Sequence, residues 1–240
     1  MNSQKMSLAE LANNGFTLLQ GAVVPSDLAR LSDEFQTAFE NATSSAFQSR
    51  GRVYAARNVI DLCPFASEVW RTEVLHRILN DVLGADFGLV RALYFDKPPN
   101  RTWSLAMHKD TSIAVKSNDT PSSWFSRPTR KANVPHVIAH ESILENMLTL
   151  RIHLDSVDKE NGPLEVIAGS HKTSKLRLTG EEVRDKIFAD RGDVLAMRPL
   201  LTHGSGASAP GTLRHRRILH LEFAADRSLP DGYQWHHFIR

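Results

Sequence analysis

Two segments far apart in the sequence carry side chains that could bind one metal ion. Residues 105–110 read Leu-Ala-Met-His-Lys-Asp, and residues 201–205 read Leu-Thr-His-Gly-Ser. If the first segment is a β-strand, His108 and Asp110 point to the same face, because side chains alternate along a strand. A second strand must then deliver His203. Two imidazoles and one carboxylate leave coordination positions open on the far side of a metal, as in non-haem Fe(II) oxygenases, so these residues predict an iron site.

The His-x-Asp pattern alone is a weak signal, since the chain has 11 histidines and short motifs match by chance. More specific sequence surrounds it. Residues 160–171 read Glu-Asn-Gly-Pro-Leu-Glu-Val-Ile-Ala-Gly-Ser-His, and residues 214–223 read Arg-His-Arg-Arg-Ile-Leu-His-Leu-Glu-Phe. With Asn-Gly-Phe-Thr-Leu-Leu-Gln-Gly at residues 14–21, most of the chain resembles the phytanoyl-CoA dioxygenase family of Fe(II)- and 2-oxoglutarate-dependent oxygenases.

The resemblance implies a fold, a reaction and a set of cofactors. The implied fold is mainly β, a cupin-like double-stranded β-helix (jelly roll) with flanking α-helices. The implied cofactors are Fe(II), 2-oxoglutarate as co-substrate, and O2. The implied reaction hydroxylates an unactivated C–H bond of a small molecule and releases succinate and CO2. Related halogenating enzymes have a small residue where this chain has Asp110, so its carboxylate favours hydroxylation.

A dicarboxylate in a desolvated pocket needs a cation, and arginine pairs with a carboxylate through two parallel hydrogen bonds. The family places this arginine shortly after the distal histidine. Counting residues selects Arg214, whereas aligning the last strand selects Arg216 after a longer loop. We favour Arg216, because a loop absorbs an insertion without turning the faces of a strand over. Ser205 matches a family position whose hydroxyl often contacts the same carboxylate; the alternative is a turn serine bonded to nearby backbone.

The segment 147–155 divides into an apolar face and a polar face that carries Thr149, Arg151 and His153. The apolar face predicts core, so the polar face should line the barrel interior. Arg151 then binds 2-oxoglutarate or the substrate, or forms a structural ion pair. We expect Thr149 to contact the substrate, together with Arg57 and Trp103 near the mouth, although each of these has a packing or surface alternative. His153 is expected to be a hydrogen-bonded core histidine.

Helices and strands that could position these residues are readable in the pattern. Apolar periodicity predicts helices from Ser7 to Gly15, from Pro25 through Phe39, and from Ser67 to Gly84. Strands are predicted at residues 87–96, 103–108, 147–155, 164–167, 193–197, 200–203 and 216–224. The polar stretch 116–141 shows no clear periodicity and is interpreted as a lid-like insertion over the metal, or else as a solvated loop. Its basic residues, with those near the mouth, favour an anionic substrate.

Length and composition predict one enzyme domain over residues 1–240. The net charge of +2 gives no reason to expect a nucleic-acid or membrane partner, so the expected partner is a small-molecule substrate; the oligomeric state stays open. The single cysteine and the lack of an apolar leader favour a cytoplasmic location. Two other functions stay open: a cupin-like isomerase or hydrolase that uses the same ligands with a redox-inert metal, and a non-catalytic ligand-binding barrel that needs no metal.

Overall fold

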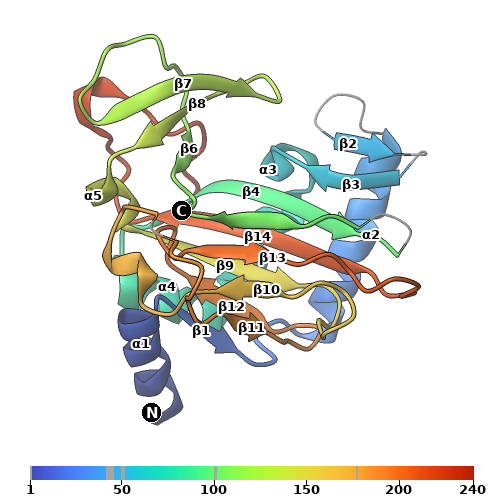
Figure 1. Ribbon diagram of the computed structural model, residues 1–240. Helices are drawn as coiled ribbons and strands as arrows, with labels where there is room; N and C mark the ends of the chain where they lie inside the picture. Colours follow the sequence, from blue (N-terminus) through green and yellow to red (C-terminus); the bar gives the residue numbers. More distant parts are fainter. Residues whose placement is uncertain (1, 42–45, 50–51, 100–101, 177) are drawn as a thin grey trace.

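The computed structural model describes residues 2–41, 46–49, 52–99, 102–176 and 178–240. Within these residues, two antiparallel sheets face each other (Figure 1). The larger sheet has the order β1 (Phe16–Leu19), β12 (Val194–Met197), β9 (Met147–His153), β14 (Arg216–Ala224), β4 (Gly88–Lys97), β3 (Arg52–Ala56) and β2 (Ala46–Ser49). The smaller sheet has the order β11 (Asp185–Ile187), β10 (Leu164–Val166), β13 (His203–Ser205) and β5 (Leu105–His108).

From β4 onward the chain passes repeatedly between the two sheets. β4, β9, β12 and β14 lie in the larger sheet, whereas β5, β10, β11 and β13 lie in the smaller one. This winding is that of a jelly roll, so the predicted double-stranded β-helix is confirmed. The strand predictions are correct to within a few residues, except that residues 200–202 precede β13. Strands β2, β3 and β11 were not predicted, nor were the strands of the insertion described below.

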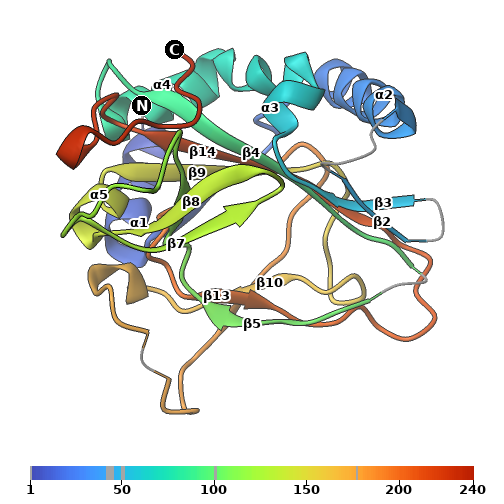
Figure 2. The same cartoon turned by 90° about the horizontal axis from the view of Figure 1, so that it is seen from above.

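Helices cover the outer face of the larger sheet. Figure 2 shows α2 (Pro25–Asn41) and α4 (Glu73–Leu83) on one side of this sheet and the smaller sheet on the other. The remaining helices are α1 (Asn2–Asn14), α3 (Val59–Leu62), α5 (Glu141–Leu144) and the 3-10 turns η1 (Pro64–Ser67), η2 (Val69–Arg71), η3 (Ser170–Lys172) and η4 (Pro230–Gly232). The helix predicted from Ser67 is wrong at its start, because residues 64–71 form two 3-10 turns and α4 begins after Thr72.

The main core lies between these helices and the apolar face of β9. Leu148, Leu150 and Ile152 are fully buried and belong to the same cluster as Leu31 of α2 and Leu79 of α4. The polar side chains of β9 therefore point the other way, into the space between the sheets, as the alternation of the sequence predicted.

The insertion between β5 and β9 is not an irregular loop. β6 (Ser112–Ala114), β8 (Val134–Ala139) and β7 (Phe125–Lys131) form a separate three-stranded sheet within the described residues. Ala132 and Asn133 both have positive φ, at 46° and 63°, and so close a tight β7–β8 turn. The prediction of a structureless stretch is wrong here, because β7 is largely exposed and hides the alternation that marks a strand.

Candidate metal centre

The predicted ligands come together at one point. One ligand atom from each of His108, Asp110 and His203 lies within 4.8 Å of the others. Asp110 Oδ1 is 3.7 Å from His108 Nε2, and Asp110 Oδ2 is 3.5 Å from His203 Nε2. The pairing of β5 with β13 sets His108 directly opposite His203, and Asp110 follows two residues after β5. Two strands distant in sequence thus deliver a two-histidine, one-carboxylate donor set.

The other ring nitrogen of each histidine is held by the backbone. His108 Nδ1 lies 2.8 Å from the carbonyl oxygen of Ala106, and His203 Nδ1 lies 2.9 Å from that of Leu201. A carbonyl can only accept a hydrogen bond, so Nδ1 carries the proton and the Nε2 lone pair is free for a metal. Burial, together with the neighbouring His108, lowers the pKa of His203 to about 4 although Asp110 opposes this. The donors therefore fit a divalent iron.

A cavity of about 380 Å³ opens beside these ligands and contains most of the predicted site. Arg57, Trp103, Arg151, Ser205 and Arg216 all line it together with the three ligands. Its apolar walls are Leu93, Phe95, Leu105 and Leu164. Thr149 is buried on the same face of β9, and its hydroxyl has no hydrogen-bond partner among the described residues, but it is not part of the wall.

Two buried arginines, Arg151 and Arg216, line the cavity, and Lys97 lies beside Arg216. We call Lys97, Arg151 and Arg216 the inner cluster. Lys97 is directly paired with Arg216 across β4 and β14, and its Nζ lies 2.7 Å from the carbonyl oxygen of Gly206 and 3.4 Å from Ser205 Oγ. Arg216 donates to the carbonyl oxygen of Gly162 at 2.5 Å.

No carboxylate is paired with the inner cluster in the described part of the chain. The Nε atoms of Arg151 and Arg216 are buried and have no hydrogen-bond partner there. Burial, with the charge of Arg151, lowers the pKa of Arg216 to about 9, and burial lowers that of Arg151 to about 10. Burial, with the charges of both arginines, lowers the pKa of Lys97 to about 7. Buried cations without an anion are costly, so this end of the cavity fits a carboxylate such as that of 2-oxoglutarate.

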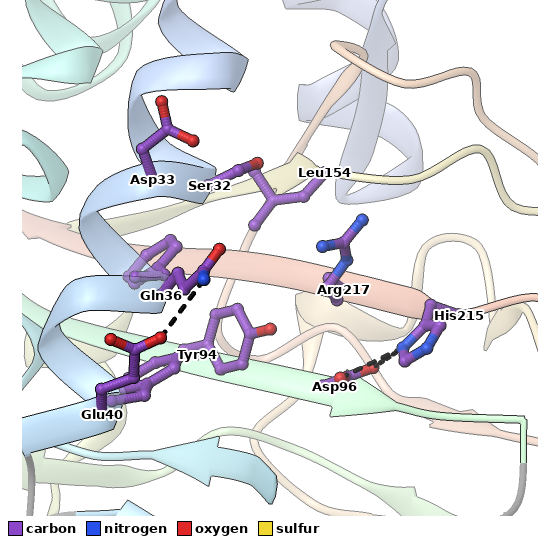
Figure 3. A pocket seen from close by; sticks show the side chains of 11 residues that line it. Ser32, Asp33, Gln36, Glu40, Tyr94, Asp96, Leu154, His215 and Arg217 are labelled. Atoms are coloured by element: carbon purple, nitrogen blue, oxygen red, sulfur yellow. Dashed lines mark hydrogen bonds and ion pairs between the residues drawn. The ribbon is translucent and has the colours of Figure 1, made fainter.

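The two arginines between which the sequence left a choice lie in different places. Arg216 is buried in the cavity wall, whereas Arg214 is half exposed and ion-paired with Asp158 and, at 3.8 Å, with Glu160. Arg217 points to the opposite face of the sheet and donates to Asp155 at 2.6 and 2.9 Å. Figure 3 shows Arg217 in a second cavity, between the sheet and α2, next to the pair formed by Asp96 and His215, which are 3.0 Å apart.

Several residues of the cavity were not predicted. Arg91 and His220 line it from the larger sheet, and Lys131 reaches it from the insertion. Arg91 occupies the inward face of β4, which alternation could have identified, whereas Lys131 is placed by a hairpin that the sequence did not reveal. Lys109, between the ligands His108 and Asp110, points away from them: its Nζ lies 2.6 Å from the carbonyl oxygen of Ser170.

The remaining histidines have other roles. His153 Nδ1 lies 3.1 Å from the carbonyl oxygen of Asp193, which confirms a bonded core histidine, and His171 contacts the carbonyl oxygen of Ala12. His236 and His237 form, with Asp61, the second group of possible metal ligands among the described residues. His237 Nε2 lies 3.2 Å from Asp61 Oδ1, so this group includes an ion pair near the surface.

Comparison with known proteins agrees with this geometry. The family model described as Phytanoyl-CoA dioxygenase (PhyH) matches residues 11–215. A search of curated protein sequences finds no match. No helix in the described residues is long and apolar enough to cross a membrane.

Solved structures share the fold at low sequence identity. AviO1 from Streptomyces viridochromogenes Tue57 is 20% identical with a TM-score of 0.65, over 95% of this chain and 97% of that one. The epimerase SnoN, in complex with Fe3+, alpha ketoglutarate and nogalamycin RO, is 14% identical with a TM-score of 0.68, over 96% and 91%. HygX from Streptomyces hygroscopicus, with nickel and 2-oxoglutarate bound, is 14% identical with a TM-score of 0.65, over 98% and 97%.

Proposed function

The chain belongs to the phytanoyl-CoA dioxygenase family, and from this premise we propose that His108, Asp110 and His203 bind its iron and that Arg216 binds its co-substrate. The protein is an Fe(II)- and 2-oxoglutarate-dependent oxygenase. With iron and 2-oxoglutarate bound, the site supplies oxidation by O2 with release of succinate and CO2. We propose that the product is a small molecule hydroxylated at an unactivated C–H bond.

One observation carries this assignment. The three ligand atoms within 4.8 Å of one another belong to the same cavity as the buried guanidinium groups of Arg151 and Arg216. A redox-inert cupin-like enzyme needs the ligands but has no use for two buried cations beside them. A non-catalytic barrel needs neither. The combination supports a metal that works with an anionic co-substrate.

The side chains of the site would position the metal and the co-substrate and neutralise their charges. His108 and His203 present Nε2 because backbone carbonyls hold their Nδ1 protons. Burial alone would raise the pKa of Asp110, but His203, His220 and His108 together lower it, so this ligand stays ionised. Arg216, with Lys97 and Ser205 nearby, would hold the distal carboxylate of 2-oxoglutarate and so direct its other end toward the ligands.

The walls of the cavity limit water. Leu93, Phe95 and Leu164 line the cavity, and the ring centres of Trp103 and Tyr54 lie 6.0 Å apart in an edge-on contact, with Lys97 Nζ 5.4 Å from the Trp103 ring centre. We propose that residues 116–141 act as a lid, since Lys131 of β7 joins the cavity wall. The single domain over residues 1–240 and the cytoplasmic location stay predictions.

The test is optical and anaerobic. Addition of Fe(II) and 2-oxoglutarate to the purified protein without O2 should give the visible charge-transfer band of a chelated 2-oxo acid at ferrous iron. In Arg216→Met the band should need a higher concentration of 2-oxoglutarate to form, and in Arg214→Met the required concentration should be unchanged. Admission of O2 should release succinate. Retention of zinc with no band under saturating 2-oxoglutarate would instead support the redox-inert alternative.

A further inference from the structure

We infer that the substrate carries an anionic oxyacid group, a carboxylate, phosphate or sulfate, which binds to a second set of cations in the cavity, Arg57, Arg91 and Lys131. We call these residues the outer cluster. The inference rests on the proposed function, since it assigns the far end of the same cavity to the substrate.

Arg91 of the outer cluster lies well away from Lys97 and Arg216 of the inner one. Lys97 and Arg91 are on the same face of β4, six residues apart, which corresponds to about 20 Å along a strand. Arg151 lies between these two ends, because it is paired with His220 of β14, and the charge of Asp110 acts on both Arg151 and Lys131. A 2-oxoglutarate molecule that reaches from the ligands to Arg216 therefore leaves the outer cluster available to another anion.

Three separate segments supply the outer cluster. Arg91 projects from β4, Arg57 precedes α3, and Lys131 ends β7 of the insertion. Arg91 and Lys131 meet at Ser112: Arg91 Nη1 donates to its carbonyl oxygen at 2.8 Å, and Lys131 Nζ lies 2.9 Å from its hydroxyl. The three cations are thus fixed around one part of the wall rather than spread over the surface.

Arg91 is ion-paired with one carboxylate among the described residues. Glu222 Oε1 lies 3.3 Å from Arg91 Nη2, but it is shared with His220 Nε2 at 3.4 Å. The Nε atom of Arg91 is buried and has no hydrogen-bond partner in the described part of the chain. Asp110, the acidic side chain among the described residues of the cavity wall, is already a proposed ligand. Arg91 and Lys131 therefore bring more positive than negative charge to this part of the wall.

The lowered pKa values of groups in and near the outer cluster agree with an excess of positive charge. Burial lowers the pKa of Lys131, and the charges of Arg91 and Arg57 lower it further. Burial, together with Arg91, Lys131 and Arg57, lowers the pKa of His136 to about 4, despite its hydrogen bond to the carbonyl oxygen of Val134. Cations that repel one another in a partly desolvated wall gain most from an anion with several acceptor oxygens.

The first experiment measures anion binding without turnover. The protein is loaded with Ni(II) and saturating 2-oxoglutarate, so that the inner cluster is occupied, and is titrated calorimetrically with inorganic sulfate. Sulfate should bind to the parent protein, and Lys131→Met and Arg57→Met should each weaken this binding about 10-fold or more, the loss expected for one charged hydrogen bond. Lys116→Met removes the same charge from the insertion outside this cavity and should have no effect.

Two results would overturn the inference. Sulfate binding that is equal in the parent and in all three variants would show that the outer cluster does not bind oxyanions. Sulfate that only displaces 2-oxoglutarate would show that the inner cluster is the only anion site. Loss of the Fe(II)–2-oxoglutarate band would instead reject the proposed function, whatever sulfate does, so the two failures are distinguishable.

The second experiment concerns the substrate. Succinate release is measured over pairs of small molecules that differ only in one anionic group, each carboxylate with its amide and each phosphate or sulfate with its parent alcohol. The anionic members should stimulate release, and Lys131→Met should raise KM with little change in kcat. Preference for the neutral members would contradict the inference. If no compound in the panel is turned over, the sulfate titration decides.

Discussion

His108 and His203 are directly paired residues of β5 and β13, and the centres of their rings lie 4.3 Å apart. Each ring makes the same local contact, from Nδ1 to the carbonyl oxygen two residues earlier, so both Nε2 atoms turn toward Asp110. Strand pairing therefore fixes the positions of the two histidines of the donor set. A site held in place in this way favours tight binding of divalent metals.

Removal of one ligand should abolish metal binding without unfolding the protein. His203→Ala and Asp110→Ala should each lower metal affinity by more than about 100-fold. Mutation of a residue that only hydrogen-bonds to a metal ligand already lowers the affinity about 10- to 100-fold. Metal content after dialysis measures this, and circular dichroism tests the fold. His140→Ala removes an exposed imidazole and is the matched control. Full metal retention in either ligand variant would reject the assignment.

The choice between two arginines is tested by one pair of variants. Arg216→Met should weaken 2-oxoglutarate binding about 10- to 100-fold, because it removes charged hydrogen bonds in a buried place. Arg214→Met breaks only an exposed ion pair with Asp158 and should leave the affinity unchanged. The binding constant of 2-oxoglutarate to the nickel-loaded variants is the measurement. The reverse order of effects would make Arg214 the co-substrate ligand.

The three candidate metal ligands could be predicted from the sequence because the prediction depends on short segments. A His-x-Asp step on a strand puts both side chains on one face, and alternation in β9 predicted which residues would point inward. Arg216 could be chosen over Arg214 only by an argument about strand register. That argument agrees with the buried place of Arg216 and with the outward direction of Arg217.

The outer part of the cavity could not be predicted from the sequence, because segments far apart in the chain form its wall. Lys131 reaches the wall through a hairpin whose strand β7 is mostly exposed, so no alternation marked it. Nothing in the sequence marked Lys97 as buried, but on β4, paired with Arg216, it is fully buried. The position of each lysine side chain depends on which strand lies beside its own strand, and strand pairing cannot be predicted from a single sequence.

Gly162 should be needed to hold Arg216 in place. Its carbonyl oxygen accepts the hydrogen bond from Arg216, its φ is +67°, and an added Cβ would meet the carbonyl oxygen of Gly206 at 2.6 Å. Gly162→Ala should therefore weaken 2-oxoglutarate binding several-fold and lower stability by more than the roughly 1–2 kcal/mol of a left-handed residue. Gly211→Ala has a similar φ with open space around it and isolates that backbone cost. Equal effects of both variants on 2-oxoglutarate affinity would contradict this role.

The pair formed by Arg217 and Asp155 should affect stability but not the co-substrate. Asp155 accepts hydrogen bonds from the backbone and the guanidinium of Arg217, and these outweigh burial and lower the pKa of Asp155. Asp155→Asn should cost about 1–2 kcal/mol at pH 7, less than for a fully buried pair because Arg217 is partly exposed.

The pH dependence of that cost has a definite sign. A carboxyl whose pKa is lowered by folding contributes stability above its unfolded pKa of about 3.9, and this contribution is lost as the pH falls through the folded value. The difference between Asp155→Asn and the parent should therefore shrink below about pH 4 in denaturant titrations. Asp158→Asn, at an exposed pair, is the control and should change stability by less than about 0.5 kcal/mol. A constant difference at all pH values would argue that the variant acts through packing.

Lys97 should make 2-oxoglutarate binding dependent on pH above neutrality. Burial, Arg216 and Arg151 lower the pKa of Lys97 to about 7 when no anion is present. A carboxylate beside Arg216 would raise that pKa toward its ordinary value, so binding takes up a proton wherever Lys97 is otherwise neutral. By linkage, affinity then decreases as the pH rises from about 7 to 9, at most about tenfold per pH unit.

Calorimetry in buffers of different ionisation enthalpy measures this proton uptake directly. The nickel-loaded parent should take up close to one proton at the upper end of this range, whereas Lys97→Met should take up none and should bind 2-oxoglutarate with a flat pH profile. Lys116→Met retains the inner cluster and should behave like the parent. Burial lowers the pKa of the proposed ligand His203 to about 4, so His203 does not titrate between about pH 7 and 9. Proton uptake that persists in Lys97→Met would assign the dependence to another group and remove Lys97 from the co-substrate site.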